Sequence, residues 1–340
     1  MGGFDDVVPL EQDDGPSPVM AIRYTDAFKR TMDNFRAIVV ANEMTARALE
    51  LTAEVVDLNP ANYTAWEYRR RCLKSLGSDL RRELRHSEEM AYENPKNYQI
   101  WFHRRAVVEL LGDPGAEMAF INNVLTEDMK NYHAWSYRQW VLKSFGTTHG
   151  LWAEELESVH HMLQLDHYNN SAWNQRWFVV SHINQDGRDS SGGDEDAAWP
   201  LPSKIILSEV QYAFSWLGKD LQNEAPWAYI RGLMRQRAPN QAVTTVAVAS
   251  PASATGTDAA RMEIEWRFQS FPSVKQNMLK LRDSEEGAKC VPMLSLLLEA
   301  SCSDVATLSS ARELCRSLVA IDTPRASYWE RRLAALTPPR

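Results

Sequence analysis

The chain has 340 residues with 37 basic and 45 acidic side chains, which gives a formal net charge of −8. No apolar run reaches the roughly 18 residues that a membrane-spanning helix needs. The excess of acidic over basic side chains argues against a surface that binds a polyanion. The four cysteines show no C-x-x-C spacing and no nearby histidine pairs, which excludes the usual zinc sites within this chain.

The N-terminal part is predicted to be a disordered acidic segment over residues 1–20, followed by a first helical pair. Residues 5–6 and 11–14 are mostly acidic, and no basic block followed by an apolar block precedes them. We therefore expect a cytoplasmic protein without a secretory signal. Apolar residues then recur at helical spacing between residues 24 and 58, which predicts two helices.

Five tryptophans mark an internal repeat: Trp66, Trp101, Trp135, Trp173 and Trp227. They are separated by 35, 34, 38 and 54 residues. Each has an asparagine four positions before it, and four of the five have an arginine three positions after it. A period near 34 residues is typical of stacked helical hairpins, each of which buries its apolar face against its neighbours.

The second repeat shows how one unit folds. Asn94 and Pro95 end a helix, because a residue before proline avoids the helical basin. Asn97 is a candidate N-cap for the next helix, and Trp101 lies one turn inside it, where it packs between helices. Arg104 follows one turn later and can reach the backbone or an acid of the adjoining repeat. All three repeated positions are therefore interpreted as structural.

Two segments interrupt the array, which is predicted to span residues 21–235. An acidic, Gly/Ser-rich loop insert at 186–202 explains the 54-residue interval, and a low-complexity linker follows at 236–260. Residues 261–340 are predicted to form C-terminal helical hairpins that continue the array. No β signal of useful length is visible. The predicted fold is all-α: a crescent-shaped, right-handed superhelical solenoid of helical hairpins.

The residues just before each tryptophan differ between repeats. They are expected to precede the helix starts and to line one edge of the solenoid, its concave rim. In the second and third repeats this edge would bring together Lys96, Tyr98, Gln99, Lys130, Asn131, Tyr132 and His133. Ammonium, phenol, amide and imidazole groups beside helix N-termini favour the binding of an anion.

Residues 94–105, 128–140 and 169–176 resemble the repeats of protein prenyltransferase α subunits, most closely the type shared by protein farnesyltransferase and geranylgeranyltransferase type I. The resemblance implies a heterodimer, active only with a farnesyltransferase or geranylgeranyltransferase type I β subunit. That partner would hold Zn²⁺ and mainly set the prenyl length, with Mg²⁺ as a second cofactor. The implied reaction transfers a farnesyl or geranylgeranyl group from its diphosphate to the cysteine of a C-terminal Cys-a-a-X tail, as on small GTPases.

The same resemblance implies roles for single residues. Lys96 and Tyr132 match residues that approach the diphosphate, and Gln99 matches the residue that binds the peptide carboxylate. Tyr98, Asn131 and His133 match residues that line the same seam, between the second and third repeats. These types suit the chemistry, because negative charge grows on the leaving diphosphate and preorganised donors stabilise it most in the transition state.

Plainer interpretations stay open. From the residues alone, Lys96 is as well explained as a solvated lysine, Tyr98 and Tyr132 as stacking between repeats, and His133 as a satisfied interface histidine. Lys130 is assigned to solvent. At the level of function, the alternatives are a tetratricopeptide-like peptide-binding scaffold and the α subunit of the Rab geranylgeranyltransferase.

Overall fold

The computed structural model describes residues 3–17, 19–20, 22–183, 201–237, 264–266, 268, 270–302 and 307–336. The chain divides into two compact units, Met1–Ala153 and Glu154–Arg340. Most of the predicted insert at 186–202 and of the predicted linker at 236–260 lies outside the described residues. The predicted disorder of residues 1–20 stays a prediction.

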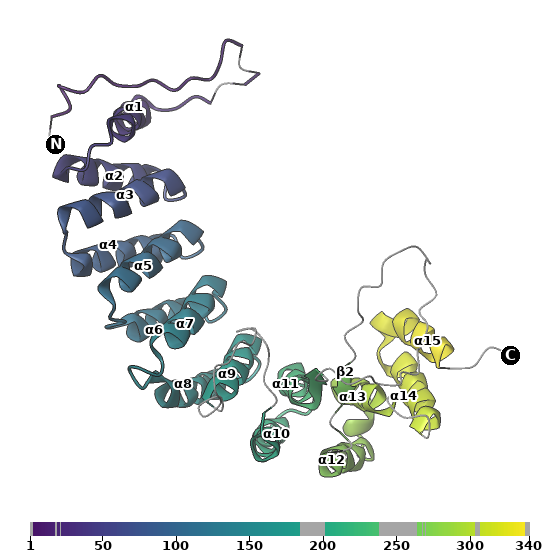
Figure 1. Cartoon of the computed structure of the whole chain (residues 1–340). Helices are drawn as coiled ribbons and strands as arrows, with labels where there is room; N and C mark the ends of the chain where they lie inside the picture. The colour runs from purple at the N-terminus through teal and green to yellow at the C-terminus, as the bar shows by residue number, and fades with distance from the viewer. Residues whose placement is uncertain are drawn as a thin grey trace. The chain divides into compact units, whose positions relative to one another are not determined.

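The first unit consists of helical hairpins, which follow one another in Figure 1. Its helices are α1 (Asp26–Ala41), α2 (Ala46–Leu58), α3 (Tyr63–Leu76), α4 (Leu80–Glu93), α5 (Tyr98–Leu111), α6 (Glu117–Glu127) and α7 (Tyr132–Phe145). The pairs α2–α3, α4–α5 and α6–α7 pack against each other as hairpins. Helix α8 (Leu151–Leu165) spans the division between the units.

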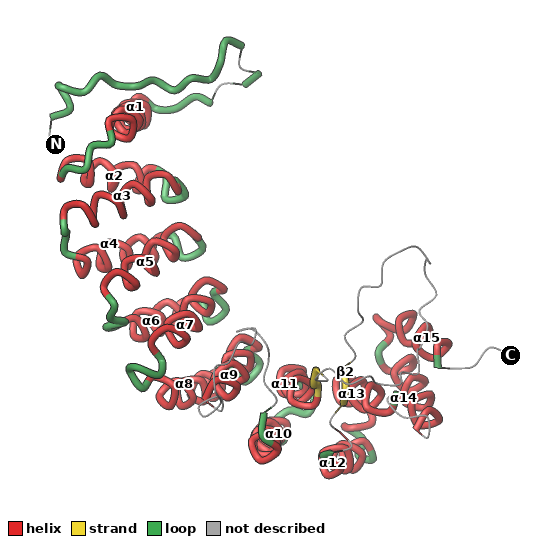
Figure 2. Tube along the Cα trace, viewed as in Figure 1, coloured by secondary structure: helices red, strands yellow, loops and turns green. Residues whose placement is uncertain are grey.

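The second unit continues with helices and one small sheet (Figure 2). Its elements are α9 (Asn170–Ile183), α10 (Ser203–Leu217), α11 (Glu224–Met234), β1 (Arg235–Arg237), β2 (Ile264–Trp266), α12 (Pro272–Arg282), η2 (Gly287–Lys289), α13 (Val291–Ser301), α14 (Leu308–Ile321), η4 (Thr323–Arg325) and α15 (Ala326–Ala335). The strands β1 and β2 pair antiparallel, Arg235 opposite Trp266. The prediction of an all-α fold of helical hairpins is confirmed, and the two strands are only three residues long each. Three-residue strands leave no usable alternation in the sequence.

The repeated asparagine and tryptophan make the same bonds in each repeat. Asn62, Asn97, Asn131 and Asn223 each cap a helix by accepting a backbone N–H of its first turn. Each repeat tryptophan donates its indole N–H to the carbonyl six residues earlier, at 2.8–3.0 Å. All five tryptophans are buried. The structural interpretation of these positions is confirmed.

The repeated arginine joins successive hairpins through a buried carboxylate. Arg69 on α3 forms a two-pronged ion pair with Glu83 on α4, at 2.6 and 2.7 Å, and also donates to the Leu49 carbonyl on α2. His103, two residues after the next repeat tryptophan, contacts Glu83 at 2.7 Å. Each such carboxylate is therefore shared by two repeats. The same arrangement recurs as Arg104–Glu117–Tyr137 and Arg176–Glu209–Tyr229.

Sequence reasoning placed the arginine near an acid of the next repeat but did not find the acid. A signal was available, because a glutamate stands 18 residues before four of the tryptophans: Glu83, Glu117, Glu155 and Glu209. It lies on the first helix of its hairpin, so the loop between the two helices sets that spacing. The described helices include none that is both long and apolar enough to cross a membrane.

Candidate functional site

The predicted edge is formed in the first unit by the starts of α3, α5 and α7. Tyr63, Tyr98 and Tyr132 are the first residues of these helices, each directly after its asparagine cap. The expectation that these positions precede the helices therefore needs a correction. They lie in the first turn, where free backbone N–H groups and the positive end of the helix dipole favour an anion.

Lys96 and the two tyrosines are the most exposed of the predicted site residues. The Lys96 side chain is 79% exposed, and its ammonium lies 3.9 Å from Asp128, a distance at the limit of an ion pair. Tyr98 is 69% exposed and Tyr132 is 71% exposed. The accessible edge thus presents the ammonium groups of Lys96 and Lys130 and three exposed phenols, because Tyr63 at the start of α3 is also 71% exposed.

The His133 ring lies against two of these phenols. Its ring meets the Tyr98 ring edge-on with centroids 4.4 Å apart, and the Tyr132 ring with centroids 5.6 Å apart. Burial lowers the pKa of His133 below its ordinary value. The imidazole is therefore neutral at pH 7. The interpretation of His133 as an interface histidine agrees with this half-buried position between two repeats.

Asn131 and Gln99 differ in how much of their amide is free. Asn131 is buried; its oxygen accepts the Ala134 N–H at 3.0 Å and its amide nitrogen donates to the Pro95 carbonyl at 3.1 Å. Gln99 is half-buried at the second position of α5. The structure thus brings all six predicted site residues to the starts of two adjacent helices. Among them the Asn131 side chain is committed to internal bonds.

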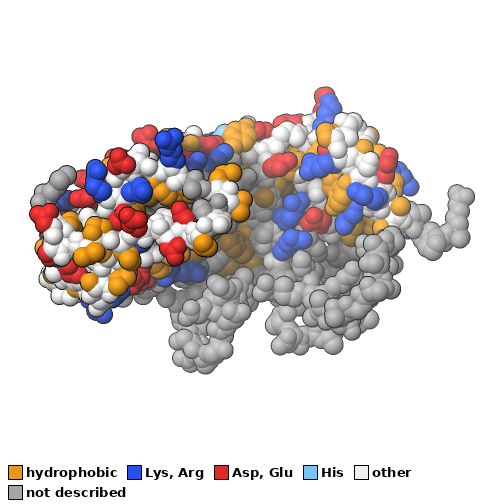
Figure 3. Space-filling view, turned by 90° about the horizontal axis from the view of Figure 1, so that it is seen from above, with side chains coloured by type: hydrophobic (Ala, Val, Ile, Leu, Met, Phe, Trp, Pro, Cys, Tyr) orange, Lys and Arg blue, Asp and Glu red, His pale blue; other side chains and the backbone are white. Residues whose placement is uncertain are grey.

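The neighbouring surface is mixed in charge. Lys130, exposed like Lys96, follows Asp128 in the loop before α7, and its backbone N–H donates to that carboxylate at 3.0 Å. Over the face shown in Figure 3, basic side chains lie among acidic and hydrophobic ones. Asp128 is the residue that sequence reasoning missed here. Its signal was visible, since Asn or Asp stands seven positions before every repeat tryptophan.

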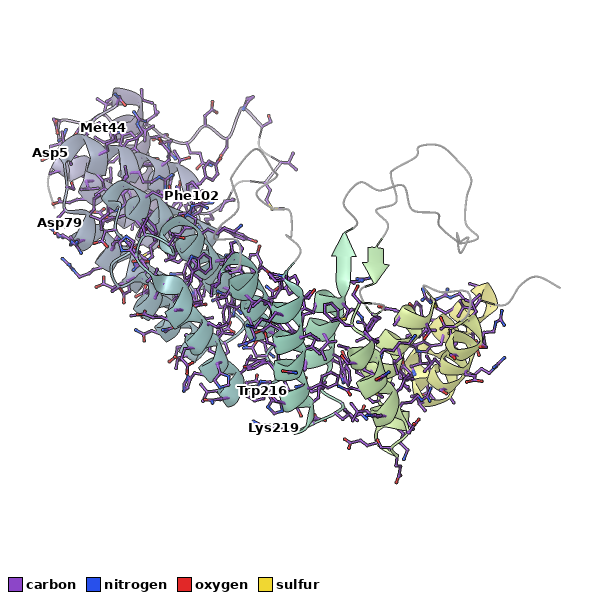
Figure 4. The ribbon with its side chains drawn as sticks, turned by 60° about the horizontal axis from the view of Figure 1, so that its bottom comes forward. Asp5, Met44, Asp79, Phe102, Trp216 and Lys219 are labelled. Atoms are coloured by element: carbon purple, nitrogen blue, oxygen red, sulfur yellow. The ribbon has the colours of Figure 1, made fainter. Side chains whose placement is uncertain are left out.

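An exposed aromatic lies on α5 one turn beyond the site. Phe102, labelled in Figure 4, is 56% exposed, and the Arg70 guanidinium lies 5.1 Å from its ring centroid. Such a cation–π contact stabilises an aromatic at the surface. Among the described residues, no group of three or more His, Cys, Asp or Glu side chains could hold a metal ion.

Comparison with known proteins gives a consistent result. Residues 45–76, 80–111, 114–145 and 152–183 match the protein prenyltransferase alpha subunit repeat. The chain is 35% identical to the protein farnesyltransferase/geranylgeranyltransferase type-1 subunit alpha of Dictyostelium discoideum, over 96% of this chain and 90% of that protein. It is 36% identical to the Arabidopsis thaliana protein of the same name, over 98% of this chain and 94% of that protein.

A solved structure shares the fold. Candida albicans protein geranylgeranyltransferase-I, complexed with GGPP, contains a chain that matches with a TM-score of 0.74 and 23% sequence identity. The match covers 98% of this chain and 99% of that chain. The first three matched repeats coincide with the hairpins α2–α3, α4–α5 and α6–α7, so sequence and structure divide the first unit in the same way.

Proposed function

Because the chain belongs to the family of α subunits shared by protein farnesyltransferase and geranylgeranyltransferase type I, we propose that it completes the active site of such an enzyme. The reaction is attack of a cysteine thiolate on the allylic carbon of a prenyl diphosphate. A carbon–sulfur bond forms, the carbon–oxygen bond breaks, and diphosphate leaves with the electron pair. The acceptor is the cysteine of a C-terminal Cys-a-a-X tail, as on small GTPases.

The observation that carries this proposal is the environment of Lys96. Arg69 on α3 and Arg104 on α5 are buried and paired with carboxylates, whereas the Lys96 ammonium, 3.9 Å from Asp128, is 79% exposed beside the start of α5. A lysine suits a diphosphate as a point charge without fixed geometry. Lys96 would stabilise the charge that develops on the leaving group, and the exposed phenol of Tyr132 would donate a hydrogen bond to it.

The remaining predicted site residues bind the peptide or line the seam between two repeats. Gln99 donates from its amide to the carboxylate at the end of the peptide, a role that needs a neutral donor. Tyr98, Asn131 and His133 line the seam between the second and third repeats. The tyrosine rings would cover the prenyl chain or the peptide when both are bound.

The proposal includes a partner and cofactors. The partner is a farnesyltransferase or geranylgeranyltransferase type I β subunit, and the complex acts in the cytoplasm. Zn²⁺ is assigned to that β subunit, and Mg²⁺ is the second expected cofactor. The roles proposed here for this chain are those of its own side chains, Lys96, Tyr132 and Gln99.

The test is co-expression with a farnesyltransferase β subunit, followed by single-turnover transfer to a Cys-a-a-X peptide. Lys96→Ala is expected to assemble normally and to lower the rate by about 10²-fold or more. Lys130→Ala is the matched control, since this lysine occupies the equivalent loop position one repeat later. Equal rates for Lys96→Ala and Lys130→Ala would refute the leaving-group role, and a chain that binds no β subunit would refute the proposal as a whole.

A further inference from the structure

Asp128 is held in place by three hydrogen bonds to its own chain segment. Its backbone N–H donates to the Val124 carbonyl at 3.1 Å, and its carbonyl accepts the Asn131 N–H at 3.0 Å. Its Oδ1 accepts the backbone N–H of Lys130 at 3.0 Å. The second carboxylate oxygen, Oδ2, lies 3.9 Å from the ammonium of Lys96, which belongs to the preceding repeat. A fixed anion therefore faces the end of a long and flexible side chain.

The same two positions face each other in the second unit. Asp220 occupies the position of Asp128, seven residues before its repeat tryptophan. Tyr168 occupies the position of Lys96, five residues before its own tryptophan. The Oδ1 of Asp220 accepts the backbone N–H two residues later at 2.8 Å, and its Oδ2 accepts a hydrogen bond from the Tyr168 hydroxyl. In both units one oxygen of the carboxylate closes the turn, and the other meets the side chain of the preceding repeat.

The turn itself does not need the negative charge. Asn59 stands at this position in the loop before α3, and its Oδ1 accepts the Ala61 N–H at 3.1 Å in the same way. The position that corresponds to Asp128 one repeat earlier, and therefore to the partner of Ala61, is the neutral Asn94. A carboxylate stands where the preceding repeat offers Lys96 or Tyr168, which can both donate a hydrogen bond. The charge of Asp128 is therefore available to the lysine.

We infer that Asp128 is a positioning residue, the counter-ion that holds the Lys96 ammonium until a diphosphate displaces it. The carboxylate competes with the diphosphate for this ammonium, so the loss of the ion pair offsets part of the attraction between Lys96 and the ligand. The inference rests on the proposed function and deepens it, because Asp128 then limits how tightly the site holds the prenyl diphosphate and the diphosphate product. An exposed ion pair changes such an equilibrium by up to about fivefold.

The test uses the heterodimer with a farnesyltransferase β subunit. It measures binding of farnesyl diphosphate and inhibition by inorganic diphosphate at about 0.15 M salt, where charges more than roughly 8 Å apart are largely screened. Asp128→Asn keeps an oxygen for the turn, as Asn59 does, and removes the charge. Both ligands are expected to bind about fivefold more tightly. A gain in affinity is a result that damage to the fold does not produce.

The rate of the chemical step should respond differently from the affinity. Lys96 has left Asp128 both in the complex with the prenyl diphosphate and in the transition state, so the energy difference between these two states does not include the ion pair. The rate constant of single-turnover transfer at saturating substrate is therefore expected to change by less than about twofold in Asp128→Asn.

A matched control and a double-mutant cycle isolate the ion pair. Asp166→Asn is the control, because Asp166 closes the same turn one repeat later, with the Tyr168 N–H at 2.9 Å, and should leave both affinities unchanged. In the Lys96→Ala background, Asp128→Asn should change the affinities by less than about twofold, because the ammonium that it holds is gone. A full gain in that background would show direct repulsion between Asp128 and the diphosphate, and would overturn the positioning role.

The outcomes separate this inference from the proposed function. Unchanged or weaker binding by Asp128→Asn, or an equal gain in Asp166→Asn, would overturn the role of Asp128 while leaving that of Lys96 intact. If Lys96→Ala binds both ligands and transfers the prenyl group as well as Lys130→Ala does, both proposals are wrong, because no ammonium at position 96 then acts on the diphosphate. If Asp128→Asn does not assemble, Asp128→Ser, whose hydroxyl forms the same kind of turn more weakly, takes its place.

Discussion

Arg104 and Glu117 form a two-pronged ion pair between consecutive hairpins, with nitrogen–oxygen distances of 2.7 and 2.8 Å. Both side chains are almost fully buried, and the Tyr137 hydroxyl donates a third hydrogen bond to the same carboxylate at 2.7 Å. The pair links α5 to α6 and, through Tyr137, to α7. Stacking of the repeats therefore depends on satisfied buried charges as well as on apolar contact.

Removing the arginine from this pair is expected to be costly. Arg104→Ala leaves the Glu117 carboxylate buried without its counter-charge, and should lower the free energy of unfolding by about 3–5 kcal/mol. The control is Arg105→Ala on the same helix, whose partner Glu109 is exposed and whose loss should cost about 1 kcal/mol or less. Urea denaturation of the two variants checks the difference. Similar midpoints for both would show that the buried pair contributes no more than a surface pair.

The equivalent contact between His103 and Glu83 predicts a pH dependence of stability. Burial lowers the pKa of His103 below its ordinary 6.5, against the hydrogen bond to Glu83, which raises it. Burial alone would raise the pKa of Glu83, but its bonds to His103 and Arg69 outweigh this and lower it to about 2. Glu83 therefore stays ionised between pH 7.5 and 5.5, while the unfolded chain gains a proton on His103 that the folded chain does not take.

The free energy of unfolding should thus fall as the pH drops below about 6.5, by at most about 1.4 kcal/mol per pH unit for this group. His103→Gln should remove that contribution without unfolding the chain, since Gln175 bonds Glu155 in the same way at 2.7 Å. The pH dependence of stability that remains in this variant comes from groups such as His86. Burial lowers the pKa of His86 as well. Urea titration at several pH values measures how the free energy of unfolding changes with pH. An equal change for His103→Gln and for the unchanged chain would contradict this assignment.

The N-terminal segment is attached to the first helices by Arg47. Its guanidinium donates to Asp6 at 2.6 and 2.9 Å and to Glu43 at 2.7 and 2.9 Å. Arg47→Ala is expected to release residues 3–6, because Arg47 also donates to the Gly3 carbonyl, whereas Leu10 is held separately by Arg36 and Asp33 of α1. Limited proteolysis and hydrogen exchange of that segment measure the change. Arg71→Ala, which removes a nearby surface arginine, serves as the control and should leave the segment protected.

Gln99 and Tyr132 should affect different kinetic constants of the heterodimer. Gln99→Ala removes a contact to the peptide carboxylate that exists before and during the reaction, so KM for the peptide should rise with little change in kcat. Tyr132→Phe removes a donor that matters most when charge develops on the diphosphate, so kcat should fall, by about 10²-fold at most for one donor. Steady-state kinetics with varied peptide separate the two. A fall in kcat alone for Gln99→Ala would rule out the carboxylate role.

The sequence by itself determined the hairpins and where their second helices begin. Asparagine caps and tryptophan wedges act within a few residues of their own positions, so the spacing of Asn97 and Trp101 is enough to locate the start of α5. The same local pattern carried the resemblance to the family. The site residues followed from it, because they occupy the variable positions beside these constant ones.

The tertiary structure alone decided how one repeat holds the next. Arg69, Arg104 and Arg176 reach glutamates that are 14, 13 and 33 residues away in the sequence, so the separation of arginine and glutamate varies with the connection between hairpins, although each glutamate keeps its distance from the next tryptophan. The contact of the His133 ring with the Tyr98 ring likewise depends on the packing of α7 beside α5. Hydrogen bonds between repeats are set by three-dimensional distance and angle, which a one-dimensional period does not contain.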